Sequence, residues 1–549
     1  MKRILFLFAF FSAVSCGVGK SAPHLPDTSS YKLEVPYPTK LNDSTFVYQD
    51  NFLTKNKQNL WELFISGNPL QLGHNNGSLT QGLMQKQEKI FFSKVEELVP
   101  SQGKQWLLRN VLKFYNRNMH RHIRNDFQAE IYGLSHYSGD TYDYIAPKFQ
   151  RNLYLHGAHD IGHALQDLML VGCSSLAVWD KQSENDKLLI GRNFDFYAGD
   201  DFAKEKIVSF VKPNDGIPYM SVTWPGMTGV VSGMNAEGLT VTINAGKSRI
   251  PLSAKTPISL VTKEILQYAK NIEEAINIAK KREVFVSESI MVGSAADRRA
   301  ILIEMSPRNF GVFEVHNSPQ LVCSNHFQSE AYENDARNQK HIAESHSQYR
   351  FDRMEELIGE NEKLDPQKMA DILRNRSGLK EIPLGYGNEK ALNQLLAHHA
   401  VIFSPEERLV WVSTSPYQLG EMVCYDLNNI FASEKGGTNL GSKERNIPRD
   451  GFADSPEFQN YELYRIKDRE MDRALLRGLT LSPEFIKQYQ ALNPDLWSVY
   501  YKAGKYYFER REYIKAQKEF EKSLTKEITT VPDQKRIEKF LRRLKRATD

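Results

Sequence analysis

The chain has 549 residues, of which 41% are hydrophobic and 25% are charged. That length exceeds one ordinary domain, and the composition is typical of a globular protein with a large buried core. The 71 basic and 67 acidic residues nearly balance, for a net charge of +4. This balance argues against a nucleic-acid partner, because such proteins usually carry a concentrated basic field.

The N-terminal segment MKRILFLFAFFSAVSC has the layout of a secretory signal. Lys2 and Arg3 precede an apolar stretch that is too short to span a membrane, and small residues precede Cys16. The letters AVSCG resemble a bacterial lipobox, so residues 1–16 are predicted to be a lipoprotein signal peptide with Cys16 as the lipid-modified residue. Ordinary cleavage nearby, releasing a soluble protein, is the alternative. Both place the fold outside the cytoplasm, and the first attaches it to a membrane through its lipid.

Three regions of different character follow along the chain. Residues 17–59 are polar and contain prolines, which predicts a linker and N-terminal extension. Over residues 60–172 the apolar residues recur mainly at helical spacing. The character changes at Cys173, where short, β-branched, turn-bounded segments such as KLLIGRNFDF and LTVTINAG indicate strands.

Helical and strand patterns then alternate through residues 173–430. A helical stretch over residues 258–281 is followed by further strand-like segments, and residues 398–414 resemble a hairpin of two strands. Strand runs separated by paired helices, with mostly antiparallel connections, predict an α+β fold in which two stacked sheets lie between helical layers.

The C-terminal part differs again. Residues 431–480 are expected to be a connector, and residues 481–549 a helical region resembling a tetratricopeptide repeat, with small and aromatic residues at the repeat's spacings: Ala503, Gly504, Tyr507, Ala516 and Phe520. One repeat cannot bury its own apolar face, so it is expected to pack on the main domain or to bind a helical protein partner. A generic helical hairpin is the alternative.

The four cysteines raise a question of pairing. If Cys16 carries a lipid, Cys173, Cys323 and Cys424 remain, which is an odd number. Cysteines of exported proteins usually pair, so at least one thiol is left over and needs an explanation. Cys323 and Cys424 can pair or be buried separately, and the sequence does not decide between these.

Cys173 is the candidate nucleophile. It opens a predicted strand and not a helix, which is unlike papain-type enzymes with their histidine base. Cutting the chain between Gly172 and Cys173 would free an α-amine, with a reference pKa of about 7.7–8.0, that accepts the thiol proton. Gly172 leaves the scissile carbonyl open to attack. In GRNFDF, Asp195 would hold the new amine, and Arg192 would favour the thiolate.

The ordered motifs GCSSLAVWD, GRNFDF, GMNAEGLTVTINAG, SNHF and SHSQYRFDR resemble those of the acyl-coenzyme A:6-aminopenicillanic acid acyltransferases. They are similar, more distantly, to those of the choloylglycine hydrolases. The resemblance covers roughly residues 60–414 and implies an αββα N-terminal nucleophile hydrolase sandwich. It implies that residues 173–430 are the catalytic core and that residues 60–172 are a propeptide-derived α chain that stays associated.

The same resemblance assigns site residues. It implies that Cys173 is the nucleophile and that Asn244 belongs to the oxyanion hole. Asn325 matches a second active-site asparagine, and Arg350 a late arginine, although Arg353 is an alternative for that role. Arg192 and Asp195 match the arginine–aspartate motif.

These observations predict an exported, self-processing amidohydrolase or acyltransferase that acts on a small N-acyl amide through an acyl-thioester. Hydrolysis is favoured, because coenzyme A is not expected outside the cytoplasm. A lipid-anchored scaffold with an inactive hydrolase body and a papain-like protease are the alternatives. No cofactor is predicted. His156, His159 and His163 share a helical face as a weak candidate metal site, with simple packing as the alternative.

Overall fold

The computed structural model describes residues 24–157, 172–196, 199, 201–248, 253–432 and 440–548. The predicted signal peptide with Cys16 lies outside these ranges, as do His159 and His163. Within the described ranges, no helix combines the length and apolar character that crossing a membrane requires.

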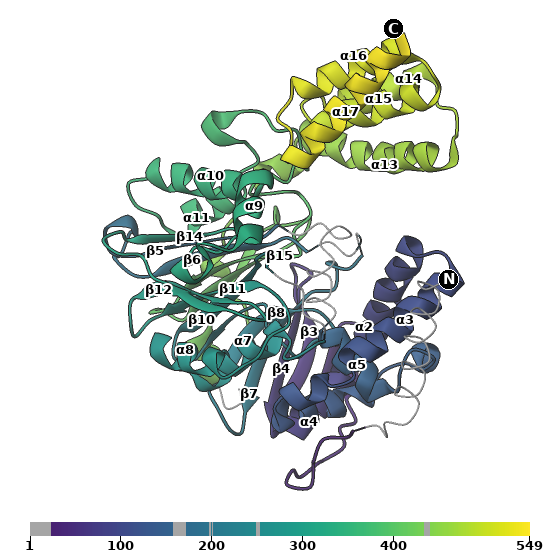
Figure 1. Ribbon diagram of the computed structural model, residues 1–549. Helices are drawn as coiled ribbons and strands as arrows, with labels where there is room; N and C mark the ends of the chain where they lie inside the picture. Colours follow the sequence, from purple (N-terminus) through teal and green to yellow (C-terminus); the bar gives the residue numbers. More distant parts are fainter. Residues whose placement is uncertain are drawn as a thin grey trace.

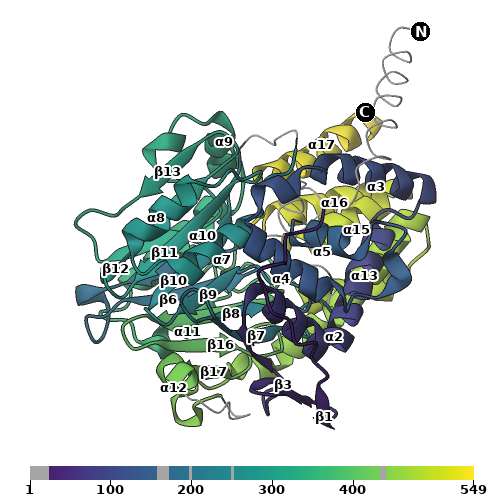
Figure 2. The ribbon, with the colours of Figure 1, turned by 90° about the horizontal axis from the view of Figure 1, so that it is seen from below.

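The larger of two sheets has eleven strands and begins far upstream of Cys173 (Figures 1 and 2). Its strands, in spatial order, are β1 (Thr39–Asn42), β2 (Thr45–Tyr48), β3 (Asn51–Lys55), β4 (Trp61–Gly67), β7 (Ile207–Pro213), β8 (Tyr219–Thr223), β9 (Ser232–Asn235), β10 (Leu239–Ala245), β11 (Glu288–Ser294), β12 (Arg299–Met305) and β13 (Phe310–Phe313). Neighbours are antiparallel, except that β4 pairs in parallel with β7.

The smaller sheet has six strands, in the order β14, β5, β6, β15, β16, β17. Their bounds are β5 (Ser174–Val178), β6 (Leu189–Phe194), β14 (Gln320–Cys323), β15 (His399–Ser404), β16 (Leu409–Ser413) and β17 (Met422–Asp426). All pairs are antiparallel, and β15 and β16 form the hairpin that the sequence predicted for residues 398–414.

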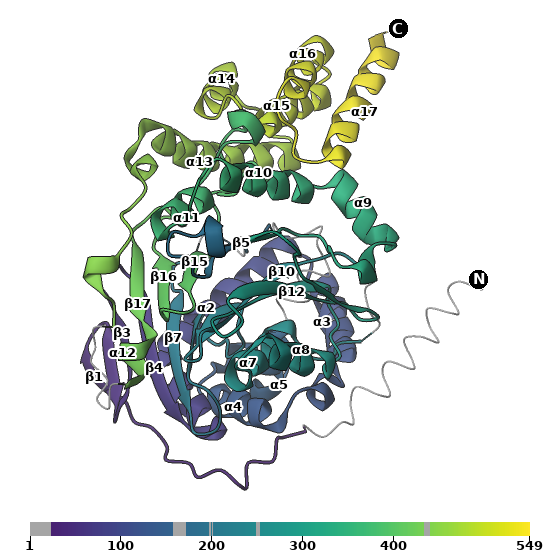
Figure 3. The same cartoon turned by 90° about the vertical axis from the view of Figure 1, so that its left-hand side faces the viewer.

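The two sheets stack face to face between helices (Figure 3). One apolar cluster joins Phe210 and Met220 of the larger sheet to Ile190 and Val401 of the smaller one. The helices α7 (Ile258–Tyr268) and α8 (Ile272–Lys280) cover the larger sheet, while α10 (Ser347–Gly359) and α11 (Pro366–Leu373) cover the smaller. Two further helices, α9 (Ala336–Glu344) and α12 (Leu427–Ala432), complete this part. The predicted α+β class and stacked sheets are confirmed.

The N-terminal region differs in part from the prediction. Helices α2 (Pro69–Leu98), α3 (Gln102–Asn116), α4 (Asn125–Ser135) and α5 (Lys148–His156) fit the helical expectation, and Asn68 caps α2 by accepting a hydrogen bond from the N–H of Gln71. However, the predicted linker of residues 17–59 contains β1 to β3, and the predicted helical region of residues 60–172 begins with β4. Apolar residues of β4 enter clusters on both of its faces, so its pattern lacks the alternation that marks a half-buried strand.

Five helices form a C-terminal unit above α9 and α10 in Figure 1. They are α13 (Pro456–Arg477), α14 (Pro483–Leu492), α15 (Trp497–Glu509), α16 (Tyr513–Leu524) and α17 (Val531–Thr548). A Cβ at Gly504 would lie 2.8 Å from the ring of Phe520, so α15 and α16 approach closely. The unit already begins at α13, inside the predicted connector, because Tyr461 and Met471 pack into its apolar core. The assignment to the tetratricopeptide class remains a prediction.

Candidate active site

Cys173 lies directly before β5, and strand alternation turns it into the space between the sheets. Leu176 and Val178 face the layer of α10 and α11, whereas Ala177 faces the larger sheet. Cys173 shares the phase of Ala177 and is fully buried. The same alternation on β6 sends Asn193 toward the helices, where it donates to the carbonyl of Leu373, and sends Arg192 between the sheets.

Arg192 lies beside the thiol. Its Nη2 is 3.7 Å from the Sγ of Cys173 and also donates to the carbonyl of Ile243. Its Nη1 donates to the carbonyl of Val231 at 2.9 Å and to the hydroxyl of Ser232. The larger sheet therefore fixes a buried cation against the sulfur. In the intact chain burial still raises the pKa of the Cys173 thiol, and the charge of Arg192 opposes this.

Asp195 is fully buried, and neither carboxylate oxygen has a hydrogen-bond partner among the described residues. Burial raises its pKa to about 8, although Arg350 and Arg192 oppose the shift. Its backbone carbonyl accepts a hydrogen bond from the N–H of Gly172 at 3.3 Å. A buried carboxylate without a donor is costly, and a cationic amine at residue 173 would supply the donor.

Asp195 should make the intact chain less stable as the pH rises. A carboxyl group whose pKa is raised to about 8 binds more protons in the folded than in the unfolded chain, so stability falls between about pH 4 and pH 8. Adding Asp195→Asn to an uncleaved Cys173→Ala background should therefore raise the melting temperature by a few degrees at pH 8, with less gain at pH 4.5. Thermal unfolding of both proteins at each pH measures this. An equal difference at both pH values would contradict it.

Arg350 reaches the site from α10, on the other side of the smaller sheet. Its Nη1 donates to the carbonyl of Cys173 at 2.5 Å and to the hydroxyl of Ser174 at 2.8 Å, and its Nη2 donates to the Oδ1 of Asn325 at 2.5 Å. Arg353, the alternative, pairs with Glu356 and Glu381 instead. The structure therefore places Arg350, and not Arg353, against Cys173.

The two predicted asparagines differ in their remaining hydrogen-bond capacity. Asn244 donates both amide hydrogens, to the carbonyls of Cys323 and Ser324 at 3.1 and 3.0 Å, and accepts from the hydroxyl of Ser175 at 2.8 Å. Its side chain thereby ties the two sheets together. Asn325 donates one hydrogen to the carbonyl of Ala245 at 3.0 Å. In this arrangement the predicted oxyanion-hole role suits the side chain of Asn325 better than that of Asn244.

Several polar residues of the site have no sequence motif. The hydroxyl of Ser232, which accepts from Arg192, lies 2.9 Å from the Nε2 of His399. The Nδ1 of His399 is 2.8 Å from the Nδ1 of His398. The carbonyl of Gly172 accepts from the side chain of Gln394 at 3.4 Å. A signal for the histidines existed in the consecutive pair that opens the strand next to β6, but nothing in the sequence pointed to Gln394.

Of the histidine motif the structure describes His156 only, and this residue and the two remaining cysteines, Cys323 and Cys424, are buried. The Nδ1 of His156 lies 2.8 Å from the carbonyl oxygen of Asn152, and its Nε2 lies 3.0 Å from the hydroxyl of Thr228. Both ring nitrogens therefore have protein partners, as in a histidine that only packs. Within the ranges given above, no group of three or more histidine, cysteine, aspartate or glutamate residues is placed to hold a metal. Cys323 and Cys424 are free and buried in different apolar clusters, so of the two possibilities the structure has them buried separately.

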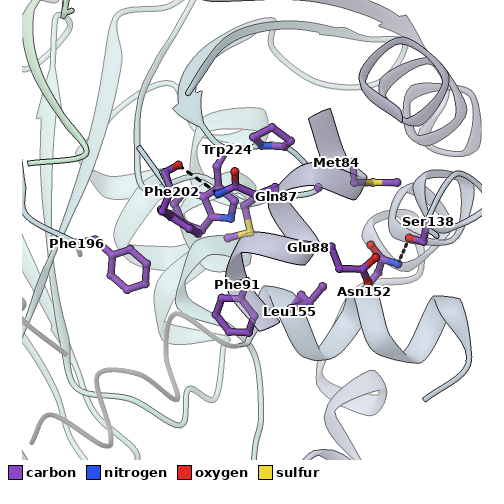
Figure 4. A pocket seen from close by; sticks show the side chains of 13 residues that line it. Met84, Gln87, Glu88, Phe91, Ser138, Asn152, Leu155, Phe196, Phe202 and Trp224 are labelled. Atoms are coloured by element: carbon purple, nitrogen blue, oxygen red, sulfur yellow. Dashed lines mark hydrogen bonds between the residues drawn. The ribbon is translucent and has the colours of Figure 1, made fainter. Parts of the chain in front are cut away.

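An aromatic pocket, whose lining residues Figure 4 shows, is connected to Arg192 through the ring of Phe194. The ring of Phe194 lies under the guanidinium of Arg192 at 4.3 Å and stacks on Phe196 and Trp224 at 5.8 and 6.4 Å. Phe196 and Trp224 line the pocket. The remaining lining residues come from α2, α5 and nearby loops: Met84, Gln87, Glu88, Phe91, Ser138, Asn152, Leu155, Phe202, Pro225, Gly226 and Met227.

Comparison with known proteins gives several likenesses. Over 274 residues the chain is 23% identical to an uncharacterized protein of Archaeoglobus fulgidus, covering 46% of this chain and 44% of that protein. The chain therefore matches less than half the length of this relative.

Two solved structures are also similar. An N-acylethanolamine-hydrolyzing acid amidase ortholog from Caenorhabditis elegans has 17% identity and a TM-score of 0.31, over 43% of this chain and 93% of that one. A mutant conjugated bile acid hydrolase from Clostridium perfringens has 15% identity and a TM-score of 0.33, over 49% and 96%.

A family model gives the match that bears on the site. The model of acyl-coenzyme A:6-aminopenicillanic acid acyl-transferase matches residues 181–415. This range contains the five other predicted catalytic residues but begins after Cys173. The resemblance seen in the sequence is confirmed, and the acyl-coenzyme A:6-aminopenicillanic acid acyl-transferases are the family that residues 181–415 of this chain match.

Proposed function

We propose that this protein cleaves itself between Gly172 and Cys173 and then hydrolyses small N-acyl amides with Cys173 as its nucleophile. The family match supports amide hydrolysis or acyl transfer in general. The observation that carries the finer proposal is the convergence on residue 173. Arg192 approaches its sulfur, Arg350 binds its carbonyl, and the Asp195 carboxyl is buried without a described partner.

The roles follow from charge and burial. After cleavage, the α-amine of Cys173 takes the thiol proton, and Asp195 gives that ammonium a buried anionic partner. The thiolate attacks the amide carbonyl, and the oxyanion is stabilised by amide donors such as that of Asn325. The α-amine returns its proton to the leaving amine. Water then resolves the thioester, while an attack by a second amine would give acyl transfer instead.

The position of Arg192 favours this chemistry over the papain-like alternative. The hydrogen-bond donor on Sγ among the described residues is the guanidinium of Arg192, not an imidazole. A scaffold with an inactive body predicts an intact chain and no turnover. Denaturing electrophoresis and an assay of the processed protein on a panel of N-acyl amides test the proposal together. An intact, inactive chain would favour the scaffold, and an intact, active chain the papain-like enzyme.

The aromatic pocket supports an apolar acyl group as the preferred substrate part. Phe196, Phe202 and Trp224 line the pocket with their rings packed against one another, and aromatic and apolar surfaces bind apolar ligands by burial. Polar side chains in the lining, such as Gln87 and Asn152, are engaged in hydrogen bonds with the protein. We therefore expect phenyl-containing and longer acyl amides to be cleaved faster than acetyl amides.

Trp224→Ala should weaken this preference. Losing the ring removes apolar contact worth about 1.5–3 kcal/mol, so kcat/KM for a phenylacetyl amide should fall about tenfold or more, while that for an acetyl amide stays within about twofold. Steady-state kinetics on the two substrates measure the change. Trp106→Ala is the control, because Trp106 lies on α3 with half of its surface exposed. Equal losses on both substrates would contradict the assignment of the pocket.

The location outside the cytoplasm, the lipid on Cys16 and a protein partner for the C-terminal helices are further parts of the proposal, and they rest on sequence motifs alone. Labelling with a radioactive fatty acid in a bacterial host tests the anchor. The wild-type chain should incorporate the label and Cys16→Ala should not.

A further inference from the structure

We infer that Gln394 is a catalytic residue of the self-cleavage step, in which its side-chain amide stabilises the oxyanion that forms on Gly172. This inference rests on the proposed self-processing and adds a donor that no motif of the chain indicates.

The geometry places this amide on the scissile carbonyl. The Nε2 of Gln394 donates to the carbonyl oxygen of Gly172 at 3.4 Å and to that of Glu389 at 3.3 Å. Gln394 is 1% exposed, so water does not compete freely for either bond. Because Glu389 accepts one amide hydrogen, it orients the group so that the other is directed at Gly172.

The missing side chain of Gly172 is what allows this contact. A Cβ atom built at residue 172 would overlap the Nε2 of Gln394, with the Oε1 of the same amide 3.1 Å away. Any larger residue would push the amide off the carbonyl. Glycine at position 172 therefore leaves room for the amide of Gln394, in addition to leaving its own carbonyl open to attack.

The scissile peptide and its donor are both held in place. The N–H of Gly172 donates to the backbone carbonyl of Asp195 at 3.3 Å, and Arg350 binds the carbonyl of Cys173. The loop that carries Gln394 is fixed on β6, since Asn193 donates to the carbonyl of Leu392 at 2.9 Å. An oxyanion donor works because it is in place before charge develops, and Gln394 already contacts the carbonyl oxygen of Gly172 at 3.4 Å in the intact chain.

Self-cleavage between Gly172 and Cys173 needs no reagent besides water. The Sγ of Cys173 bonds to the carbonyl carbon of Gly172, and the carbonyl oxygen gains the negative charge that Gln394 binds. As the charge returns, the bond between this carbon and the nitrogen of Cys173 breaks, and the thiol proton ends on that nitrogen. Water then hydrolyses the thioester, which gives the carboxylate of Gly172 and the free thiol and amine of Cys173.

The test follows cleavage of the full-length chain over time. Wild-type and variant proteins are made by cell-free synthesis and sampled on denaturing gels, with the fragments identified by mass spectrometry. Gln394→Met keeps the size of the side chain and removes the donor, so cleavage should slow about tenfold or more. Gln418→Met is the matched control: Gln418 is equally buried and donates to the backbone carbonyl of Leu373 at 2.9 Å, away from the scissile bond. Its cleavage should stay within about twofold of wild type.

Gly172→Ala keeps the inference testable if Gln394→Met fails to fold, because its Cβ displaces the amide of Gln394 without changing residue 394. This variant should also cleave more slowly, and cleavage at the wild-type rate would overturn the role of Gln394. Where both variants fold, adding Gln394→Met to Gly172→Ala should cost less than about threefold, because the contact is already broken. Cleavage of Gln394→Met at the wild-type rate, or independent effects of the two substitutions, would overturn the role of Gln394 and leave the proposed function standing. A wild-type chain that never cleaves would instead refute the proposed function itself.

Discussion

Cys173→Ala should leave the chain in one piece and abolish amide hydrolysis. Alanine has no sulfur to attack the carbonyl of Gly172, so the peptide bond survives and no free α-amine forms. Denaturing electrophoresis should show two fragments for the wild type and a single band for the variant. Mass spectrometry should find Cys173 at the start of the larger wild-type fragment.

Cys424→Ala is the matched control for this substitution. Cys424 is also free and fully buried, but it lies on β17 in the cluster beneath α10 and α11. Removing its sulfur should cost some stability through the small cavity left behind, and cleavage should proceed as in the wild type. Active wild-type protein that is continuous across residues 172 and 173 would disprove the proposed mechanism.

Arg350→Met should lower kcat/KM by about 100-fold or more and delay cleavage. The substitution removes the donor from the carbonyl of Cys173, the hydroxyl of Ser174 and the Oδ1 of Asn325. A hydrogen bond to a charged donor contributes about 1.5–3 kcal/mol, and about 2.7 kcal/mol corresponds to the expected 100-fold loss. Steady-state kinetics on the processed fraction and a cleavage time course measure the two effects.

Arg353→Met provides the comparison within the same helix. Arg353 is as completely buried as Arg350, but its acidic partner Glu381 is 61% exposed and stays solvated when the arginine is lost. Its kcat/KM should remain within about fivefold of wild type, with melting temperatures reporting any loss of folding. Similar losses of activity in both variants would mean that α10 supports the site only as a scaffold.

Much of the fold of residues 173–430 was predictable, because its strands are short, rich in β-branched residues and bounded by turns. The motifs around Cys173, Arg192 and Asn325 fall on or beside such strands, which is why their approach to one another was foreseeable. The choice between Arg350 and Arg353 was not. They lie on one helix, three residues apart and both fully buried, and only the packing of α10 against β5 separates them.

Other features depend on contacts between distant parts of the chain. Residues 61–67 form a strand by pairing with β7, which lies well over a hundred residues later in the chain. The local sequence pattern does not indicate this pairing. Gln394 lies in a loop, where a glutamine is ordinarily a solvated residue. Asn244 occupies a motif position, yet its amide is used by the carbonyls of β14 and the residue after it. The motifs led to the proposed chemistry, and the tertiary contacts determine which side-chain atoms remain available for it.

The parallel pairing of β4 with β7 bears on the fate of a nicked chain. Seven register pairs, from Trp61 with Ile207 to Gly67 with Pro213, cross from one fragment to the other. Loss of the shorter fragment would remove strands β1 to β4 from the larger sheet and leave β7 as an exposed edge strand. An exposed edge strand can pair with other chains and so promotes aggregation. The fragments should therefore elute as a single noncovalent heterodimer from a sizing column. Expressed separately, the longer fragment should aggregate. Under the proposed self-cleavage, folding would therefore precede the cut.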